Sequence, residues 1–492
     1  MSRARCEIVW CALLLLWAAT GLGAVQPAKP PTDNPGELER RFVEAFGAGK
    51  LDEAQAALER MIAVSPADPN PHYNMACVLV RRGNLAGAEA SLRRAVDLGF
   101  TSFDTMRRDE DLAPLRETET FRSILARAAS LQDQAIDRRL AALRKGFGEG
   151  YQYEKDEVLR LAFVSGFEAA SFAAARREVA QLEAWWRTQV LPEGGDAPER
   201  APAWVTVIWP NRADWNRWAQ KTFGDRFGSV GGIYDHSRKE LVAQDLGPTM
   251  RHEFWHVLHW RDMDRRGQVH PVWIQEGLCS LVEDLEHSAD DAAKFRPVAS
   301  WRTNSLKRLQ AAGRLPTMKS ILEMTPERFS GTRPLANYAA ARALFLFLAD
   351  RGHLRAWYGA YVEGYGEDRT GARAFERVFG KPLAEVEKDW RAWLKQLPEV
   401  AEINRPGEAE LPFGINEQGA GDGLPITSLS GAAREAGLRP RDVLTSINGK
   451  PVRDAGDLAR VLGEFKAGET VEVGYRRGGT TGTARVTLLR RE

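Results

Sequence analysis

The segment His252–His256, with the sequence HEFWH, constrains the fold of this chain more than any other feature. Residues four apart lie on one face of a helix, so His252 and His256 would project their imidazoles to the same side. Two nitrogens placed in this way can occupy two corners of a tetrahedral Zn²⁺ site, and Glu253 between them can accept a proton from water. The pattern therefore predicts a helix that carries two metal ligands and a general base.

A catalytic zinc needs a third protein ligand, and two carboxylates are candidates. Glu276 follows His256 after 19 intervening residues, on a predicted amphipathic helix. Asp262 lies six residues after His256, the spacing at which metzincin-type enzymes place a ligand after a sharp turn. That turn requires glycine, and the chain has His259 there, which favours a continuing helix. We therefore prefer Glu276 and keep Asp262 as the alternative.

The pattern His252-Glu253-x-x-His256 followed by Glu276 resembles the gluzincin metallopeptidases. The segment around Glu276, Trp273-x-x-Glu276-Gly277, resembles smaller gluzincin-like families of secreted bacterial proteins. The resemblance implies that His252, His256 and Glu276 bind Zn²⁺ and that Glu253 is the general base. It also implies a zincin fold, in which strands precede the metal helix and a helical half follows it.

Two features depart from the family pattern. Thermolysin-like enzymes carry an aspartate four residues beyond the ligand glutamate, where this chain has Ser280. The partner that orients a zinc histidine must therefore come from elsewhere, with Glu283 and Asp284 as candidates. The chain also lacks the Gly-x-Met-Glu-Asn motif with which gluzincin aminopeptidases bind the substrate's amino terminus. This difference favours endopeptidase activity.

Residues 145–398 are expected to form the zincin-like α+β domain. Strands are predicted over residues 151–153, 158–164 and 204–209, and a helix is predicted over residues 168–190. A hairpin over residues 233–236 and 240–244 precedes the metal helix. We expect residues 240–244 to bind substrate in extended form by backbone pairing.

The resemblance further implies that a tyrosine from the later half donates a hydrogen bond to the oxyanion formed during peptide hydrolysis. Tyr338 is our candidate for this second catalytic residue, because it lies in a helix predicted over residues 337–348. His353 and Tyr358 are the alternatives. A tyrosine at this position could also simply pack in the core.

A repeat of 34 residues occupies the N-terminal part of the chain. Four positions of one unit recur in the next, namely Gly49, Leu51, Ala54 and Leu58 at Gly83, Leu85, Ala88 and Leu92. This period resembles tetratricopeptide repeats, so residues 36–130 are expected to form paired helices. They would either bind an extended peptide or partner protein, or act as a helical spacer.

Residues 411–492 resemble a PDZ domain through Ala432–Leu438, Asp442–Leu444 and Ile447–Gly449. The loop that receives a peptide's C-terminal carboxylate in that family would be residues 412–415. Its usual first glycine is a proline here, and Arg441 replaces the common glycine before the aspartate. The resemblance implies peptide binding at a sheet edge, with a purely stabilising module as the alternative.

Residues 1–24 have the layout of a secretory signal peptide, since two arginines precede a short apolar run that ends in small residues. An uncleaved membrane anchor is the alternative, although the run is short for a membrane span. The signal peptide predicts a secreted or periplasmic protein. The cysteines beyond it, Cys77 and Cys279, are too few and too far apart to indicate a disulfide framework.

Composition is compatible with several folded regions and gives no indication of nucleic-acid binding. With 492 residues and 43% hydrophobic residues, the chain can bury more than one core. The 68 basic and 67 acidic residues leave a net charge of +1.

The chain is thus predicted to be multidomain α+β, with helical repeats, a zincin-like metallopeptidase domain and a small, mostly-β PDZ domain. The predicted function is that of an exported zinc metallopeptidase that cleaves peptide or protein substrates and binds partners through its repeat and PDZ modules. A scaffold with the same fold but no turnover is one alternative. A hydrolase of a non-peptide amide is another.

Overall fold

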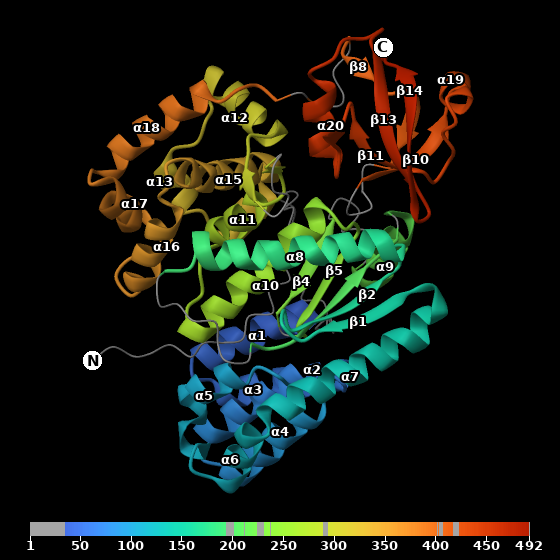
Figure 1. The fold of residues 1–492 in the computed structure, drawn as a ribbon. Coiled ribbons are helices and arrows are strands. Elements are labelled where there is room, and N and C mark those ends of the chain that lie inside the picture. The colour runs from blue at the N-terminus through green and yellow to red at the C-terminus, as the bar shows by residue number, and fades with distance from the viewer. Residues whose placement is uncertain are drawn as a thin grey trace, which may run out of the picture.

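The computed structural model describes residues 35–192, 201–210, 212–223, 231–236, 238–288, 294–400, 402, 407–416 and 423–491. A helical N-terminal region, a mixed α/β middle region and a C-terminal region built on a β-sheet follow one another along the chain (Figure 1). This arrangement confirms the predicted multidomain α+β class. The predicted signal peptide, residues 1–24, lies outside the described residues.

The N-terminal region is helical, and its residues from Phe42 to Leu131 share one core. The first four helices are α1 (Pro35–Gly47), α2 (Leu51–Val64), α3 (Pro69–Arg81) and α4 (Leu85–Asp97). Gly49 and Gly83 have positive φ angles in the turns before α2 and α4, a conformation that glycine adopts without steric cost. The repeat therefore places its glycines at turns. The region continues with α5 (Phe103–Arg108), η1 (Glu110–Leu115), α6 (Glu119–Ala126), α7 (Ala128–Phe147) and η2 (Gly148–Gly150).

The middle region begins with a five-stranded sheet in the order β1-β2-β3-β5-β4. Its elements are β1 (Gln152–Asp156), β2 (Leu161–Ser165), α8 (Ala169–Gln189), β3 (Trp204–Ile208), α9 (Arg212–Phe223), β4 (Gly232–Asp235) and β5 (Glu240–Ala243). The parallel strands β2 and β3 are buried along their whole length, as expected where both faces of a sheet are covered.

The predicted role of residues 240–244 in binding substrate is wrong. β5 pairs with β3 on one side and with β4 on the other, so its backbone groups are already used. The outer strand on this side of the sheet is β4, and among the described residues β5 is the strand with which it pairs. An added peptide strand needs an outer strand of a sheet, so β4 is the strand that could bind it.

Two helices after the sheet carry the predicted metal ligands, and a helical half follows them (Figure 1). These two are α10 (Pro248–Arg266) and α11 (Val272–Leu281). The remaining elements of the middle region are β6 (Leu285–His287), β7 (Phe295–Pro297), α12 (Trp301–Ala311), α13 (Met318–Leu322), α14 (Pro326–Gly331), α15 (Pro334–Asp350), α16 (Leu354–Glu363), α17 (Ala372–Phe379) and α18 (Leu383–Gln396).

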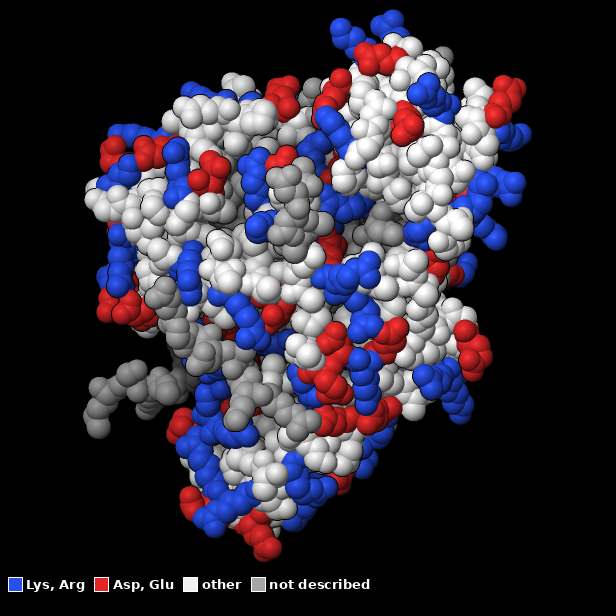
Figure 2. All heavy atoms as spheres, viewed as in Figure 1, with Lys and Arg blue, Asp and Glu red and all other residues white. Residues whose placement is uncertain are grey.

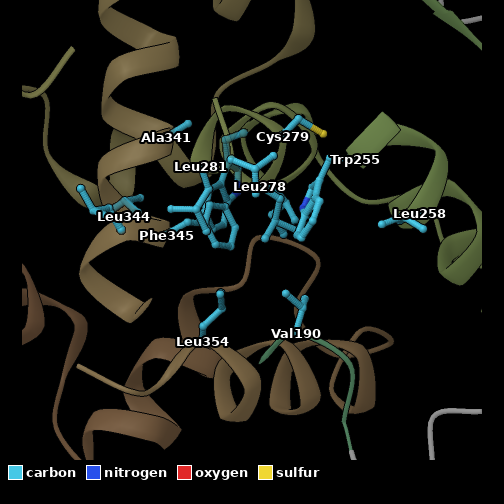
Figure 3. Close-up of a cluster of buried hydrophobic side chains, with 14 of the residues drawn as sticks. Val190, Trp255, Leu258, Leu278, Cys279, Leu281, Ala341, Leu344, Phe345 and Leu354 are labelled. Carbon is cyan, nitrogen blue, oxygen red and sulfur yellow. The ribbon is translucent and has the colours of Figure 1, made fainter. Parts of the chain in front are cut away.

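An apolar core fixes α11 between α10 and α15. Figure 3 shows Leu278 and Leu281 of α11 among Trp255 from α10 and Phe345 from α15. A Cβ atom on Gly277 would lie 2.7 Å from the ring of Phe345 and 2.9 Å from the carbonyl oxygen of Ala341. The absence of a side chain at this position, directly after Glu276, therefore lets α15 approach α11 closely.

The C-terminal region is a sheet in the order β14-β13-β11-β10-β9, to which β12 is added beside β11. Its elements are β8 (Ala409–Glu410), β9 (Phe413–Ile415), β10 (Leu424–Leu429), α19 (Gly431–Glu435), β11 (Val443–Ile447), β12 (Lys450–Pro451), α20 (Ala455–Leu462), β13 (Thr470–Arg477), β14 (Thr480–Thr487) and β15 (Leu489–Arg490). Arg441 has a φ angle of 74°, a left-handed conformation that explains why glycine suits this position.

Candidate metal centre

The helix α10 starts and ends at identifiable signals. Its N-cap is Gly247, and Pro248 occupies the first turn, where a missing N–H costs nothing. The carboxylate of Asp245 accepts hydrogen bonds from the backbone N–H groups of Gly247 (2.9 Å) and Thr249 (3.1 Å). The helix ends at Gly267, which adopts the left-handed conformation of a C-cap. It therefore runs without a break through the histidines.

Three side chains converge at one point. Nε2 of His252 lies 3.2 Å from Nε2 of His256, and both nitrogens face Oε2 of Glu276, at 3.3 Å and 3.7 Å. One ligand atom from each residue lies within 4.8 Å of the other two. The structure thus brings together the three residues predicted as ligands, two from a single turn of α10 and one from α11.

The spacing of these atoms fits a zinc ion. Zinc binds nitrogen and carboxylate oxygen at about 2.0–2.2 Å, and the edges of such a tetrahedron are about 1.6 times longer, or roughly 3.4 Å. The three separations between His252, His256 and Glu276 lie within a few tenths of an ångström of this length. Two imidazoles and one carboxylate are also the donor set of catalytic zinc sites that leave the fourth position open.

The ring of His252 is oriented by Glu283. Its Nδ1 lies 2.8 Å from Oε1 of Glu283, and Oε2 of the same carboxylate accepts hydrogen bonds from Arg302 at 3.0 Å and 2.5 Å. Burial opposes ionisation of Glu283, but Arg302 and His252 outweigh it and lower its pKa to about 2. An ionised carboxylate only accepts hydrogen bonds, so Nδ1 of His252 carries the proton and Nε2 is left for a metal.

Of the two predicted candidates for this orienting role, the structure places Glu283 beside the histidine. Asp284 instead faces Arg342 of α15, 3.4 Å away. Glu283 lies in the turn that directly follows α11, two residues beyond the last helical residue, Leu281. The orienting carboxylate therefore comes from the segment after the helix, because Ser280 on the helix has none.

Asp262, the alternative third ligand, is used elsewhere. Its carboxylate accepts hydrogen bonds from Arg265 (2.5 Å), Arg266 (2.7 Å) and the hydroxyl of Tyr358 (2.8 Å). α10 continues through His259, so the turn that would direct Asp262 to the metal does not form. Tyr358 is occupied by the same contact. His353, the other alternative to Tyr338, precedes α16 and contacts the ring of Phe379.

Glu253 is buried against the edge strand β4. A Cβ atom on Gly232 would lie 2.5 Å from Oε1 of Glu253, so only glycine allows the strand to approach this carboxylate so closely. Burial raises the pKa of Glu253 to about 8, although the neighbouring His252 opposes the shift. A carboxylate with a pKa near neutrality is suited to accept and return a proton.

Tyr338 lies on α15 and faces the same cluster. Burial raises the pKa of its hydroxyl well above the usual value, and the charge of Glu276 and a hydrogen bond to that carboxylate raise it further. The hydroxyl therefore stays protonated and can donate. Of the three residues considered for the oxyanion, Tyr338 is the one that the structure brings to Glu253 and Glu276.

At the three predicted ligands, neighbouring charges shift the pKa in the direction opposite to the shift caused by burial. Burial disfavours the protonated form of His252, but hydrogen bonds to Glu276 and Glu283 outweigh it and raise its pKa to about 10. Burial lowers the pKa of His256, against the attraction of Glu276. For Glu276, burial raises the pKa, but the two histidines outweigh it and keep the carboxylate ionised. A buried anion beside two imidazoles is a charge arrangement that favours a divalent cation.

Sequence reasoning missed three residues of the site. Tyr234 of β4 stacks on the ring of His256, with centroids 4.7 Å apart and planes 9° from parallel. Arg302 holds Glu283, and Arg251 lies in the first turn of the ligand helix α10 with 2% of its surface exposed. No motif indicates the two arginines. The fact that Arg251 directly precedes His252 on a helix predicted to be buried is the one signal that could have singled it out.

Comparisons with known proteins identify the two flanking regions. Residues 414–488 match the PDZ domain family, and residues 45–100 match a tetratricopeptide repeat family. These matches confirm the N-terminal repeats and the C-terminal PDZ domain. Modules of both kinds typically mediate protein or peptide interactions.

Matches to individual proteins are more limited. A probable periplasmic serine endoprotease, DegP-like, from Bartonella henselae is 32% identical over 84 residues, which cover 17% of this chain and 17% of that protein. A match to the crystal structure of an aminopeptidase N family protein from Idiomarina loihiensis covers 70% of this chain and 67% of that protein's chain. The sequence identity is 12% and the TM-score is 0.27. A likeness of that size does not establish a shared fold.

Two further observations concern the surface and the helices. Figure 2 shows basic and acidic side chains interspersed over the visible face, in line with the near-zero net charge. Among the described residues, no helix combines the length and the apolar character that crossing a bilayer requires.

Proposed function

We propose that this protein is an exported, zinc-dependent metallopeptidase. The observation that carries the proposal is the convergence of His252, His256 and Glu276 at separations that match the edges of a tetrahedral zinc site. Zinc bound there would lower the pKa of a water molecule and polarise a peptide carbonyl. This chemistry requires a proton acceptor and an oxyanion donor close by, and the chain offers a candidate for each.

Glu253 is our candidate for the proton carrier. Its carboxylate is buried against Gly232, and its raised pKa lets it take a proton and pass it to the leaving amine. Tyr338 is our candidate for the oxyanion donor, because its hydroxyl is protonated and lies within reach of Glu276. The edge of β4 beside these groups would bind an extended peptide by backbone pairing.

The flanking modules support a peptide or protein substrate over a small non-peptide amide. Regions that match tetratricopeptide and PDZ families stand on either side of the metal centre in the chain. The missing aminopeptidase motif favours cleavage within a chain over removal of single residues. Export is proposed from the signal-peptide layout of residues 1–24.

Glu253→Gln is the variant that tests this function. The amide cannot accept the proton, so hydrolysis of a mixed peptide library should fall by at least about 10²-fold. Zinc content, measured by atomic absorption after chelator treatment and reloading, should stay at one ion per chain for both proteins. His256→Ala is the matched control and should lose both zinc and activity.

Three results would contradict the proposal. A parent protein that takes up no zinc would remove the metal centre. A Glu253→Gln variant as active as the parent would remove the base. A zinc-loaded parent that binds library peptides but cleaves none would establish the inactive scaffold instead. The serine at position 280 does not by itself favour that scaffold, because Glu283 contacts Nδ1 of His252.

A further inference from the structure

The PDZ region makes a buried contact with the helix that carries the metal histidines. Asp454, the N-cap residue of α20, lies 2.7 Å from Nη2 of Arg251, and Arg251 directly precedes His252. Both side chains of this ion pair are less than a tenth exposed. A buried guanidinium must be neutralised, and here Asp454 shares that task with Glu178 of α8, 3.2 Å away.

Arg251 connects this ion pair to the segment that orients His252. Its Nε donates to the carbonyl of Val282 (2.9 Å), and its Nη2 donates to the carbonyl of Glu283 (2.5 Å). The side chain of Glu283 in turn holds Nδ1 of His252. One guanidinium therefore contacts the PDZ helix and also holds the backbone of the residue that sets the ring of a predicted metal ligand.

Two more contacts press α20 onto the same segment. Arg460, two turns along the helix, donates to the carbonyl of Leu285 at 3.1 Å. A Cβ atom on Gly456 would lie 3.2 Å from Oδ1 of Asp284, so the helix approaches that residue closely. Residues 283–285 are thus held from the PDZ side as well as from α10.

We propose that Asp454 is a positioning residue of the metal centre, acting through Arg251 and the backbone of Glu283 on the ring of His252. The PDZ region then has a structural role in the site, in addition to any role in binding peptides. The measurements of metal binding that test this proposal rest on the function proposed above. The amide exchange of residues 282–288 can be measured without metal, so the two proposals can fail separately.

Asp454→Ser separates this contact from the stability of the PDZ region. Serine is also a favoured N-cap residue, so α20 keeps its cap while the carboxylate that reaches Arg251 is lost. Asp442→Ser is the matched control. Asp442 is equally buried, but its carboxylate accepts hydrogen bonds from Arg439 and Arg477, which belong to the PDZ region itself.

The first measurement is amide hydrogen exchange of the full, metal-free chain. In Asp454→Ser, exchange of residues 282–288 should be roughly fivefold faster than in the parent, because one of the groups that hold Arg251 is gone. In Asp442→Ser, exchange should rise within the PDZ region and stay unchanged in residues 282–288. Equal exchange of residues 282–288 in parent and Asp454→Ser, or an equal rise in both variants, would overturn the proposal.

The second measurement is zinc affinity by competition with a chromogenic chelator. Partners of metal ligands typically change affinity by about 10–100-fold, and Asp454 acts one step further away, so Asp454→Ser should bind roughly three- to tenfold more weakly. Asp442→Ser should stay within about twofold of the parent. The visible absorption of Co²⁺ in the same site should shift in Asp454→Ser alone, because that spectrum reports ligand geometry.

The outcomes identify which idea fails. If the parent binds no zinc but exchange in residues 282–288 responds to Asp454→Ser, the proposed function fails and the positioning contact stands. If zinc binds equally to parent and Asp454→Ser and exchange is also unchanged, the positioning role fails and the metallopeptidase proposal is unaffected.

Discussion

Individual residues around the proposed metal centre have roles that depend on their neighbours in space. Glu283 orients His252 because Arg302 keeps its carboxylate ionised and directed at the ring. Glu253 packs closely against Gly232 because glycine has no side chain. Tyr338 contacts the carboxylate of Glu276 and could therefore either stabilise the oxyanion or hold the ligand. The kinetics of a single variant distinguish these two roles.

Tyr338→Phe removes the hydroxyl and keeps the ring. If the hydroxyl donates to the oxyanion, kcat should fall by about 10²-fold while KM and zinc affinity change by less than about threefold. If it mainly holds Glu276, zinc affinity should fall with kcat. Steady-state kinetics and chelator competition on the same preparation measure both. A variant with unchanged kcat would remove Tyr338 from the mechanism.

At the scale of elements, α10 carries a further histidine, His259, which contacts His270 in the segment after the helix. His259 and His270 are fully buried, and their ring nitrogens lie 2.7 Å apart. Burial lowers the pKa of His259 to about 3 and that of His270 well below its usual value. Both imidazoles are therefore neutral in the folded protein at pH 7, and this neutrality links the stability of α10 to pH.

The sign of that link follows from the two pKa values. Between pH 6.5 and about 3, His259 is protonated in the unfolded chain and neutral in the fold, so the free energy of unfolding decreases as pH falls through this range. One such group lowers the free energy of unfolding by about 1.4 kcal/mol for each pH unit below 6.5, which amounts to about 2 kcal/mol at pH 5. The neutral form thus stabilises the fold fully above pH 6.5.

His259→Gln should remove this pH dependence, because glutamine does not titrate and can still hydrogen-bond to His270. Chemical unfolding of the metal-free protein, followed by tryptophan fluorescence at pH 7.5 and pH 5, measures it. The parent should lose about 2 kcal/mol more than the variant between these pH values. The comparison at pH 7.5 controls for packing changes. Equal losses in both proteins would mean that His259 is protonated in the fold.

At the scale of the whole molecule, the middle region is contacted from both ends of the chain. The PDZ region reaches Arg251 near the start of α10, whereas the repeat region reaches the last turns of the same helix. There the carboxylate of Asp264 accepts hydrogen bonds from Arg108 (3.0 Å) and Thr105 (3.1 Å) of α5. The helix α10, which carries the proposed metal ligands, is therefore held by contacts from both modules.

Asp264→Ala should loosen the repeat region from α10. It leaves Arg108 and Thr105 without this acceptor, so the free energy of unfolding should fall by about 1–3 kcal/mol. Glu110→Ala in the same region is the control, because Glu110 is exposed and its ion pair with Arg116 lies within the repeat region. Urea unfolding should show a change below about 0.5 kcal/mol for the control. Equal effects would mean that the contact between the regions adds no stability.

Much of this organisation could be predicted from the order of residues. The repeat glycines, the strand and helix positions before α10, and the PDZ segments all follow local patterns of period and turn chemistry. The strand that faces the site could not be predicted in this way. β4 and β5 form one hairpin, and the pairing of β5 with β3 alone makes β4 the edge.

The sequence by itself determined that His252 and His256 share a helical face, because a four-residue spacing on a helix is a local property. It also favoured Glu276 over Asp262 through the lack of a glycine turn. Only the tertiary structure decided that Glu283 orients His252 and that Asp454, more than 200 residues away, contacts Arg251. Such contacts depend on how helices and regions pack, and no local spacing encodes that packing.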